Sequence, residues 1–263
     1  MGRDYAFGDS DLAARRLELV AAVFGEPTRA LLHRAARLHG PVGLAVDLGC
    51  GPGLSTALLH ETVGATRTVG LDASPAFVAR ASARAPAEVS YMVHDVRSVP
   101  FPVGPADVVL ARLLLAHLPD PVGTARTWVT QLKEGGLLVL DEIEFIHTGH
   151  PVLARYEELA VAVVAARGGP MYAGPELAAP GALGGRGWMV RACELVRLPV
   201  ATAQAAAMFS LNLPTWRDDG AITSRWTTDE VDSLARQLDE LRHSPATGEI
   251  TWGLRQVVVE RTG

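Results

Sequence analysis

The sequence has little cysteine, no excess of basic charge and no long apolar run. Cys50 and Cys193 are its only cysteines, too few and too far apart for a disulfide framework or a zinc cluster. A net charge of −5 provides no basic field that would attract nucleic acid. No apolar run approaches the roughly eighteen residues of a membrane span, and residues 1–16 are too polar for a secretory signal. We therefore expect a cytoplasmic protein that acts on small molecules, without nucleic-acid or membrane partners.

Short apolar runs alternate with helical or turn segments over the first half of the chain. Five of them read as buried strands, at 44–48, 68–72, 89–95, 106–111 and 135–145. Parallel strands need crossover connections and are covered on both faces, so this alternation predicts an α/β fold with a doubly wound sheet. Two more strand patterns follow at 188–200 and 251–263, the last as an edge strand. The prediction is a seven-stranded, mostly parallel sheet.

The spacing of apolar residues predicts helices over much of the rest of the chain. Residues 9–38 read as two helices divided by Pro27, and further helices are expected at 152–167 and 227–243, the latter capped by Thr227 or Thr228. Residues 174–187 read as loop. We expect an N-terminal helical cap at 1–40 and a main domain at 41–263, with lid segments near 146–187 and 201–226.

The stretch "AVDLGCGPGLST" places alternating glycines directly after the first predicted strand. Gly49, Gly51 and Gly53 let the backbone turn sharply and approach a ligand closely, at the sheet edge where open α/β folds bind ligands. A dinucleotide fingerprint would require a glycine at position 54, where this chain has Leu54. Asp47 precedes the turn and suits a ligand that carries an amine and a sulfonium better than a pyrophosphate.

In this respect the chain resembles the class I S-adenosylmethionine-dependent methyltransferases. "VDLGCGPG" matches the first motif of that family residue for residue, and the resemblance extends over residues 44–145. It implies a Rossmann-like methyltransferase fold with S-adenosylmethionine as cofactor. It also implies that Asp72 binds the ribose and that Asp95 binds the adenine amino group. The cofactor-binding residues it implies are Asp47, Gly49, Cys50, Gly51, Gly53, Asp72, Ala73, Ser74, Asp95, Val96, Ala111 and Arg112. A shorter likeness at the N-terminus adds Tyr5 and Arg16.

The candidates for chemistry and for acceptor binding lie outside the glycine turn. His117 follows the fourth predicted strand, Glu142 lies toward the end of the fifth, and both are candidate catalytic residues. Tyr172, Trp188 and Trp216 are the candidate substrate-binding residues, and with Met171, Met208 and Phe209 they suit an apolar pocket. The Asp-Asn pair of metal-dependent catechol relatives is missing, so we expect no metal. The Asn- or Asp-Pro-Pro-aromatic signature of nucleic-acid methylating relatives is missing as well.

These features together predict methyl transfer to a small organic acceptor, at oxygen or nitrogen rather than carbon. The acceptor is expected to be an apolar or aromatic metabolite of a specialised biosynthetic pathway. Two alternatives stay open: a non-methylating descendant of the same fold that binds the cofactor, and an NAD(P)-dependent oxidoreductase. The sequence also leaves the oligomeric state open, with a homodimer among the options.

Overall fold

The computed structural model describes residues 7–244 and 248–263, so the predicted contact Tyr5 lies outside the described residues. The strands are β1 (Leu44–Leu48), β2 (Arg67–Asp72), β3 (Val89–Val93), β4 (Ala106–Arg112), β5 (Leu132–His147), β6 (Trp188–Ala201) and β7 (Glu249–Arg261). The helices described are α1 (Asp11–His39), α2 (Leu54–Val63), α3 (Pro75–Ser82), a 3-10 turn η1 (Leu115–His117), α4 (Pro121–Val129), α5 (Pro151–Ala166), α6 (Gly174–Ala178), α7 (Thr202–Ser210), α8 (Leu213–Trp216), α9 (Gly220–Thr223) and α10 (Thr228–Arg242). No helix among these residues is long and apolar enough to cross a membrane.

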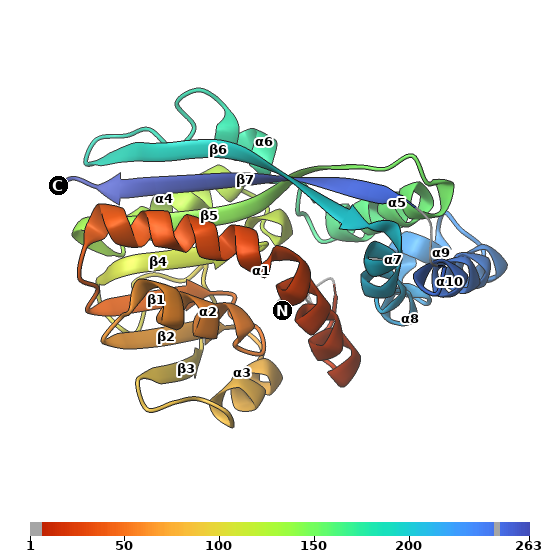
Figure 1. Ribbon diagram of the computed structural model, residues 1–263, viewed down its shortest axis with the longest axis horizontal. Helices are drawn as coiled ribbons and strands as arrows, with labels where there is room; N and C mark the ends of the chain where they lie inside the picture. The colour runs from red at the N-terminus through yellow and green to blue at the C-terminus, as the bar shows by residue number, and fades with distance from the viewer. Residues whose placement is uncertain (1–6, 245–247) are drawn as a thin grey trace.

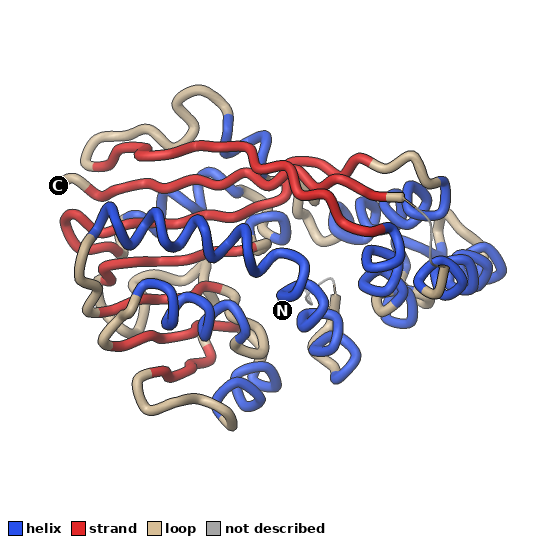
Figure 2. The backbone as a smooth tube through the Cα atoms, viewed as in Figure 1, coloured by secondary structure: helices blue, strands red, loops and turns tan. Residues whose placement is uncertain are grey.

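All seven strands form one sheet in the order β3-β2-β1-β4-β5-β7-β6 (Figure 2). Neighbours from β3 to β5 are parallel, and β7 runs antiparallel between β5 and β6. The predicted seven-stranded, mostly parallel sheet is confirmed. The prediction that the last strand is an edge strand is wrong. Val257, Val258 and Val259 form a continuous, fully buried run, which is typical of a strand covered on both faces, and β6 takes the edge instead.

The helices α1 and α2 cover one face of the sheet, and α4 and α6 cover the other (Figure 1). The predicted break at Pro27 is wrong, because α1 continues through it with a bend part-way along. Proline removes one backbone hydrogen bond, but side chains hold the surrounding turn. The Thr28 hydroxyl donates to the Phe24 carbonyl and lies 2.7 Å from the Asp141 carboxylate, and Gln256 donates to the Pro27 carbonyl.

Helices α5 and α7 to α10 gather beyond one end of the long strands β5, β6 and β7 (Figure 1). α5 and α7 to α10 pack around an apolar cluster that includes Trp216, Trp252 and Phe209. α10 begins with the predicted cap: Thr227 and Glu230 form a reciprocal capping box. The predicted loop 174–187 contains the short helix α6. Helices α5 and α7 to α10, which we call the lid, lie on the side of the sheet where β1, β2 and β4 end.

Candidate active site

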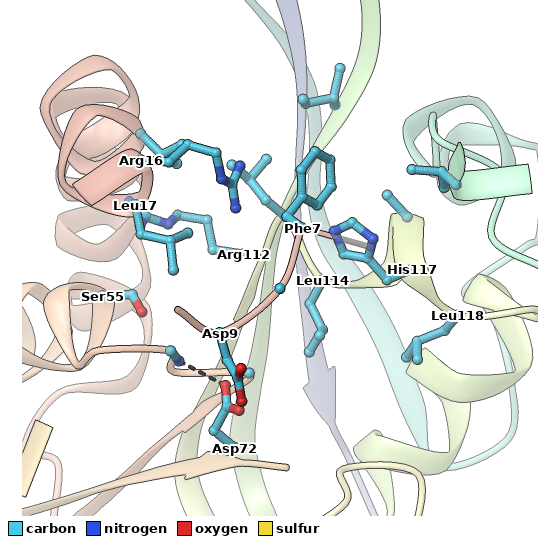
Figure 3. Close-up of a pocket in the computed structure, with 18 of the residues that line it drawn as sticks. Phe7, Asp9, Arg16, Leu17, Ser55, Asp72, Arg112, Leu114, His117 and Leu118 are labelled. Atoms are coloured by element: carbon cyan, nitrogen blue, oxygen red, sulfur yellow. Dashed lines mark hydrogen bonds between the residues drawn. The ribbon is translucent and has the colours of Figure 1, made fainter. Parts of the chain in front are cut away.

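A cavity of about 590 Å³ opens at the carboxyl ends of β1, β2 and β4 and continues under the lid. We call its two parts the turn half and the lid half. The turn half is lined by Gly49, Cys50, Gly51, Pro52, Leu54, Ser55, Asp72, Ala73, Ser74, Pro75, Phe77, Asp95, Val96, Arg97, Arg112 and Leu114. The lid half is lined by Phe24, Ile143, Ile146, Tyr156, Glu157, Ala160, Val164, Arg167, Met171, Met208, Phe209, Asn212 and Trp252. The segment around Phe7 and the start of α1 lies between them (Figure 3).

The glycines of the turn have two different structural tasks. Gly49 and Gly51 adopt φ values of 63° and 52°, and both line the cavity. A Cβ on Gly49 would come within 2.7 Å of Leu114. Gly53 has φ 92° and does not line the cavity; a Cβ there would lie 2.6 Å from the Tyr91 hydroxyl. Gly53 therefore allows α2 to pack closely on β3, whereas Gly49 and Gly51 keep the cavity wall bare.

Asp72 ends β2 and presents its carboxylate to the turn half. Its Oδ2 accepts from the Gly51 amide and its Oδ1 accepts from the Ser74 amide, each at 2.8 Å (Figure 3 shows its place). Burial raises the pKa of Asp72, and nearby Asp9 raises it further. A carboxylate oxygen has two lone pairs, so each oxygen can still accept one hydroxyl hydrogen. The Ser74 hydroxyl donates to Asp9 at 2.8 Å, which ties the N-terminal segment to the same strand end.

Asp47 lies beneath the turn and does not line the cavity. Its Oδ2 accepts from the hydroxyls of Ser55 and Thr56, both at 2.7 Å, and so holds the first turn of α2. Its Oδ1 is buried with no partner among the described residues. Burial raises the pKa of Asp47 to about 6. Asp47 was a predicted cofactor contact, and the structure instead places it behind the cavity wall, where it supports the turn.

Asp95 lies at the outer end of the turn half, after β3. Arg97 forms a two-pronged ion pair with it, and this hydrogen bonding lowers the pKa of Asp95. Its side chain is 41% exposed. The neighbouring Val96 carbonyl accepts from Trp128 Nε1 at 2.8 Å, which fixes the loop that carries both residues.

Glu142 holds the turn after β4 in place. Its Oε1 accepts from the amides of Leu114 and Leu115, each at 2.8 Å, and Leu113 adopts a positive φ of 52° in that turn. Its Oε2 is buried without a partner among the described residues, although the side chain lines the cavity. Burial raises the pKa of Glu142 to about 8, so the carboxyl is largely protonated at neutral pH.

His117 lines the cavity where the two halves meet. Its ring packs edge-on against Phe7 at 5.4 Å, and the Arg16 guanidinium lies over the other side of Phe7 at 4.3 Å (Figure 3). Burial lowers the pKa of His117 to about 3, and Arg16 and Arg167 lower it further. A neutral imidazole with so low a pKa is a weak base at neutral pH. Among residues 7–244 and 248–263, no three His, Cys, Asp or Glu side chains are grouped to hold a metal ion.

The structure brings most of the predicted cofactor residues to one cavity. Gly49, Cys50, Gly51, Asp72, Ala73, Ser74, Asp95, Val96, Arg112 and Arg16 line it, as do the candidate catalytic residues His117 and Glu142. Ala111 is fully buried in β4 and does not line the cavity, because the strand alternation turns Arg112 toward it instead. Burial lowers the pKa of the Arg112 guanidinium, and the nearby carboxylates of Asp141 and Asp47 partly oppose this shift by favouring its charged form.

The predicted substrate residues are placed less favourably. Trp188 begins β6 opposite Arg261, at the far edge of the sheet from the cavity, and packs on the α4 side, so its assignment to substrate binding is wrong. Trp216 is fully buried behind the cavity wall, where its ring stacks on Tyr156 at 5.6 Å. Tyr172 donates to Glu157, which lines the lid half, but Tyr172 itself does not line it.

Sequence reasoning missed several lid-half residues. Tyr156, Ala160 and Val164 share one face of α5, as their spacing of four predicts, but the sequence does not say which face meets the cavity. Asn212 and Trp252 stand alone in their segments and carry no pattern. No sequence signal links Asp9 to Asp72, because their proximity depends on the fold.

Comparison with known proteins agrees with this geometry. Residues 46–140 match a family model described as "Methyltransferase domain". This segment is a class I methyltransferase domain. The predicted family and fold are thereby confirmed, and S-adenosylmethionine is the cofactor of that family.

The methyltransferase domain is also the part that curated relatives share. The trans-aconitate 2-methyltransferase of Azoarcus sp. (strain BH72) is 37% identical over 116 residues, which is 44% of this chain and 45% of that protein. The alignment thus spans less than half of either protein.

Two solved structures resemble the whole fold. A SAM-dependent methyltransferase from Thiobacillus denitrificans, in complex with S-adenosyl-L-homocysteine, has a TM-score of 0.52 and 20% identity over 87% of this chain and 89% of that chain. The cyclase SpnF has a TM-score of 0.51 and 19% identity over 90% of this chain and 81% of that chain. At these identities the likeness shows the fold alone.

Proposed function

We propose that this protein transfers a methyl group from S-adenosylmethionine to an oxygen or nitrogen of a small, largely apolar acceptor. The observation that carries the proposal is the single cavity that joins the turn half to the apolar lid half. A donor site and an acceptor site that share one cavity bring the two reacting groups together without a separate transfer step.

The residues of the turn half fit the cofactor. The Asp72 carboxylate has capacity for two hydroxyl hydrogens of a ribose, and the positive φ values of Gly49 and Gly51 leave the wall free of side chains. Asp47 acts from beneath the turn, where it accepts from the hydroxyls of Ser55 and Thr56 and so holds the first turn of α2 against the cavity. Arg16 and Arg112 supply positive charge at the boundary, which suits a carboxylate.

Methyl transfer requires little of the protein beyond the correct placement of the donor and the acceptor. The bound cofactor supplies a methyl carbon whose bond to sulfur breaks as the acceptor's lone pair bonds to it, and sulfur keeps the bonding electrons. The lid half holds the acceptor in line and excludes water. Where the acceptor must lose a proton, the ionised form of Glu142 has a free oxygen in the cavity to receive it, and because the pKa of Glu142 is about 8 this form increases as the pH rises toward 8.

The lining favours an acceptor with little charge. Nine of the thirteen lid-half residues are apolar, and Arg167 is already paired with Asp219 at 2.6 Å. The curated relatives are named for trans-aconitate, so this tricarboxylate belongs in the acceptor screen. The apolar lining argues for a less charged molecule. A specialised biosynthetic pathway and a cytoplasmic location remain predictions from the sequence.

The proposal is tested by calorimetric titration with S-adenosylhomocysteine and, separately, with NADH. Micromolar binding of the first alone supports the proposal, and binding of NADH alone refutes it in favour of an oxidoreductase. A screen with isotopically labelled S-adenosylmethionine, including trans-aconitate and aromatic hydroxyl and amino compounds, then tests transfer. Binding without transfer to any of them supports a non-methylating protein of this fold. Glu142→Gln is expected to lower turnover more than cofactor affinity; unchanged turnover at saturating acceptor would remove Glu142 from the chemistry.

A further inference from the structure

Aromatic rings form a continuous wall around the lid half. Tyr156 and Phe209 stack at 3.9 Å with their planes 10° apart, Phe209 meets Trp252 at 5.8 Å, and Trp252 meets Phe24 at 5.6 Å. All four residues line the cavity. The rings give each other definite orientations, so they present a rigid apolar surface suited to a flat ring system.

One polar pair interrupts this wall. Asn212, just before α8, donates from Nδ2 to the Tyr156 hydroxyl, and both side chains line the cavity although each residue is only 3% exposed. The Oδ1 of Asn212 is buried and has no partner among the described residues. A buried amide oxygen without a hydrogen bond destabilises the folded protein, and a bound donor would remove that cost. The lid half therefore contains an unsatisfied polar group in an otherwise apolar setting.

The pair leaves at least one donor and at least one acceptor, whichever way the amide is turned. When Nδ2 donates to the Tyr156 oxygen, the phenolic hydrogen stays available as a donor and Oδ1 as an acceptor. When the amide is reversed, the phenol donates to Oδ1, the amide hydrogens become the donors and the phenolic oxygen the acceptor. A hydroxyl group both donates and accepts, whereas an ether or a carbonyl only accepts and an ammonium only donates.

We infer that Tyr156 and Asn212 select an acceptor that carries a hydroxyl group on an apolar, ring-shaped body. This inference rests on the proposed function, since it takes the lid half to be the acceptor's place. The two residues determine specificity, because they bind the hydroxyl of the acceptor and so fix how the acceptor lies against the aromatic wall. A molecule with the same shape and no hydroxyl leaves Oδ1 unpaired, and such a loss discriminates more strongly than a missing methylene does.

The test compares two probes of nearly equal size, 2-naphthol and 2-fluoronaphthalene. Each is titrated into the intact 263-residue chain with and without saturating S-adenosylhomocysteine. We expect the wild-type protein to bind 2-naphthol about tenfold more tightly, the effect of one buried hydrogen-bonded group. Tyr156→Phe and Asn212→Leu are each expected to reduce this preference to below about twofold. Tyr156→Phe keeps the ring that stacks on Phe209, so it carries the test if Asn212→Leu lowers the yield of folded protein.

Ser210→Ala is the matched control. Its hydroxyl lies at the end of α7, donates to the Ala207 carbonyl within the same helix, and does not line the cavity. The variant should keep the full preference for 2-naphthol. A preference that survives in both Tyr156→Phe and Asn212→Leu, no preference in the wild type, or no binding of either probe overturns the inference.

The two proposals fail in different ways. Binding of S-adenosylhomocysteine with no preference between the probes leaves the proposed function intact and removes the hydroxyl site; an ordered water that satisfies Asn212 would give this result. A preference that depends on Tyr156 and Asn212, without binding of S-adenosylhomocysteine, leaves the hydroxyl site intact and removes the proposed function.

Discussion

The two halves of the cavity are built in opposite ways. The turn half is made largely by backbone and carboxylates at the ends of β1, β2, β3 and β4, all within residues 49–114. The lid half is made by side chains from α1, β5, α5, α7 and β7, which come from both ends of the chain. Strand ends of a parallel sheet are placed by the fold itself, while a helical lid can exchange its side chains without disturbing the sheet.

This difference accounts for the pattern of likeness to other proteins. The matched family segment, residues 46–140, contains the turn half and ends before the lid begins. The donor side can therefore be shared among proteins that act on different molecules, and the acceptor side is particular to each. Substitutions in the turn half should change cofactor binding, and those in the lid half should change the choice of acceptor.

The largest effect that would test this division is expected from Asp72→Ala. The loss of two charge-assisted hydrogen bonds should weaken S-adenosylhomocysteine binding about 100-fold or more. Asp95→Ala should cost less than about tenfold, because Asp95 is 41% exposed and already paired with Arg97. Calorimetric titration measures both affinities, and a melting curve confirms that each variant is folded. Equal losses at the two sites would contradict the assignment of Asp72 as the main contact.

The next effect concerns Glu142, which lies between the halves. Its carboxyl has an ordinary pKa of 4.5, and burial raises that pKa to about 8 in the folded protein. The folded state thus keeps a proton that the unfolded chain has released, so this group costs stability progressively as the pH rises from about 4.5 to about 8. Glu142→Gln keeps an oxygen for the amides of Leu114 and Leu115 and should be more stable than the wild type at pH 8, by about 2 kcal/mol or more.

Urea unfolding at pH 5, 7 and 8 measures this difference, which should nearly vanish at pH 5. Asp95→Asn is the control of opposite sign, because hydrogen bonding to Arg97 lowers the pKa of Asp95 and its ionised form stabilises the fold at neutral pH. A pH-independent difference for Glu142→Gln would show that the carboxyl is ionised throughout this range.

A smaller effect separates the glycines of the turn. Gly53→Ala should lower the free energy of unfolding by about 1–3 kcal/mol. The φ of 92° disfavours a side chain at this position, and the added Cβ would lie only 2.6 Å from the Tyr91 hydroxyl. The affinity of the folded variant for S-adenosylhomocysteine should change less than about twofold, since Gly53 does not line the cavity. Gly49→Ala is the comparison, and there both stability and affinity should fall. A loss of affinity in folded Gly53→Ala would place Gly53 in the binding site.

What the sequence could predict follows the same division. The strands were found because buried parallel strands are short apolar runs. Asp72 and Asp95 each end such a predicted run, and the resemblance to the methyltransferase family identified them. The edge position of the last strand was mispredicted, because order within a sheet depends on long-range pairing. Asn212 could not be found, since its role depends on an unpaired atom beside Tyr156, 56 residues away. Periodicity reports which residues share a face, not what that face meets.

The smallest effect is expected at Trp188, and it tests whether aromatic composition alone marks the lid half. Trp188 starts β6 opposite Arg261, on the side of the sheet away from the cavity. Trp188→Phe keeps an apolar ring there, so binding of S-adenosylhomocysteine and of 2-naphthol should each change by less than about twofold. Phe209→Leu, which removes one ring of the aromatic wall, is the matched variant and should weaken 2-naphthol alone. If 2-naphthol affinity changed as much in Trp188→Phe as in Phe209→Leu, acceptor binding would depend on a residue remote from the cavity. The assignment of acceptor binding to the lid half would then be wrong.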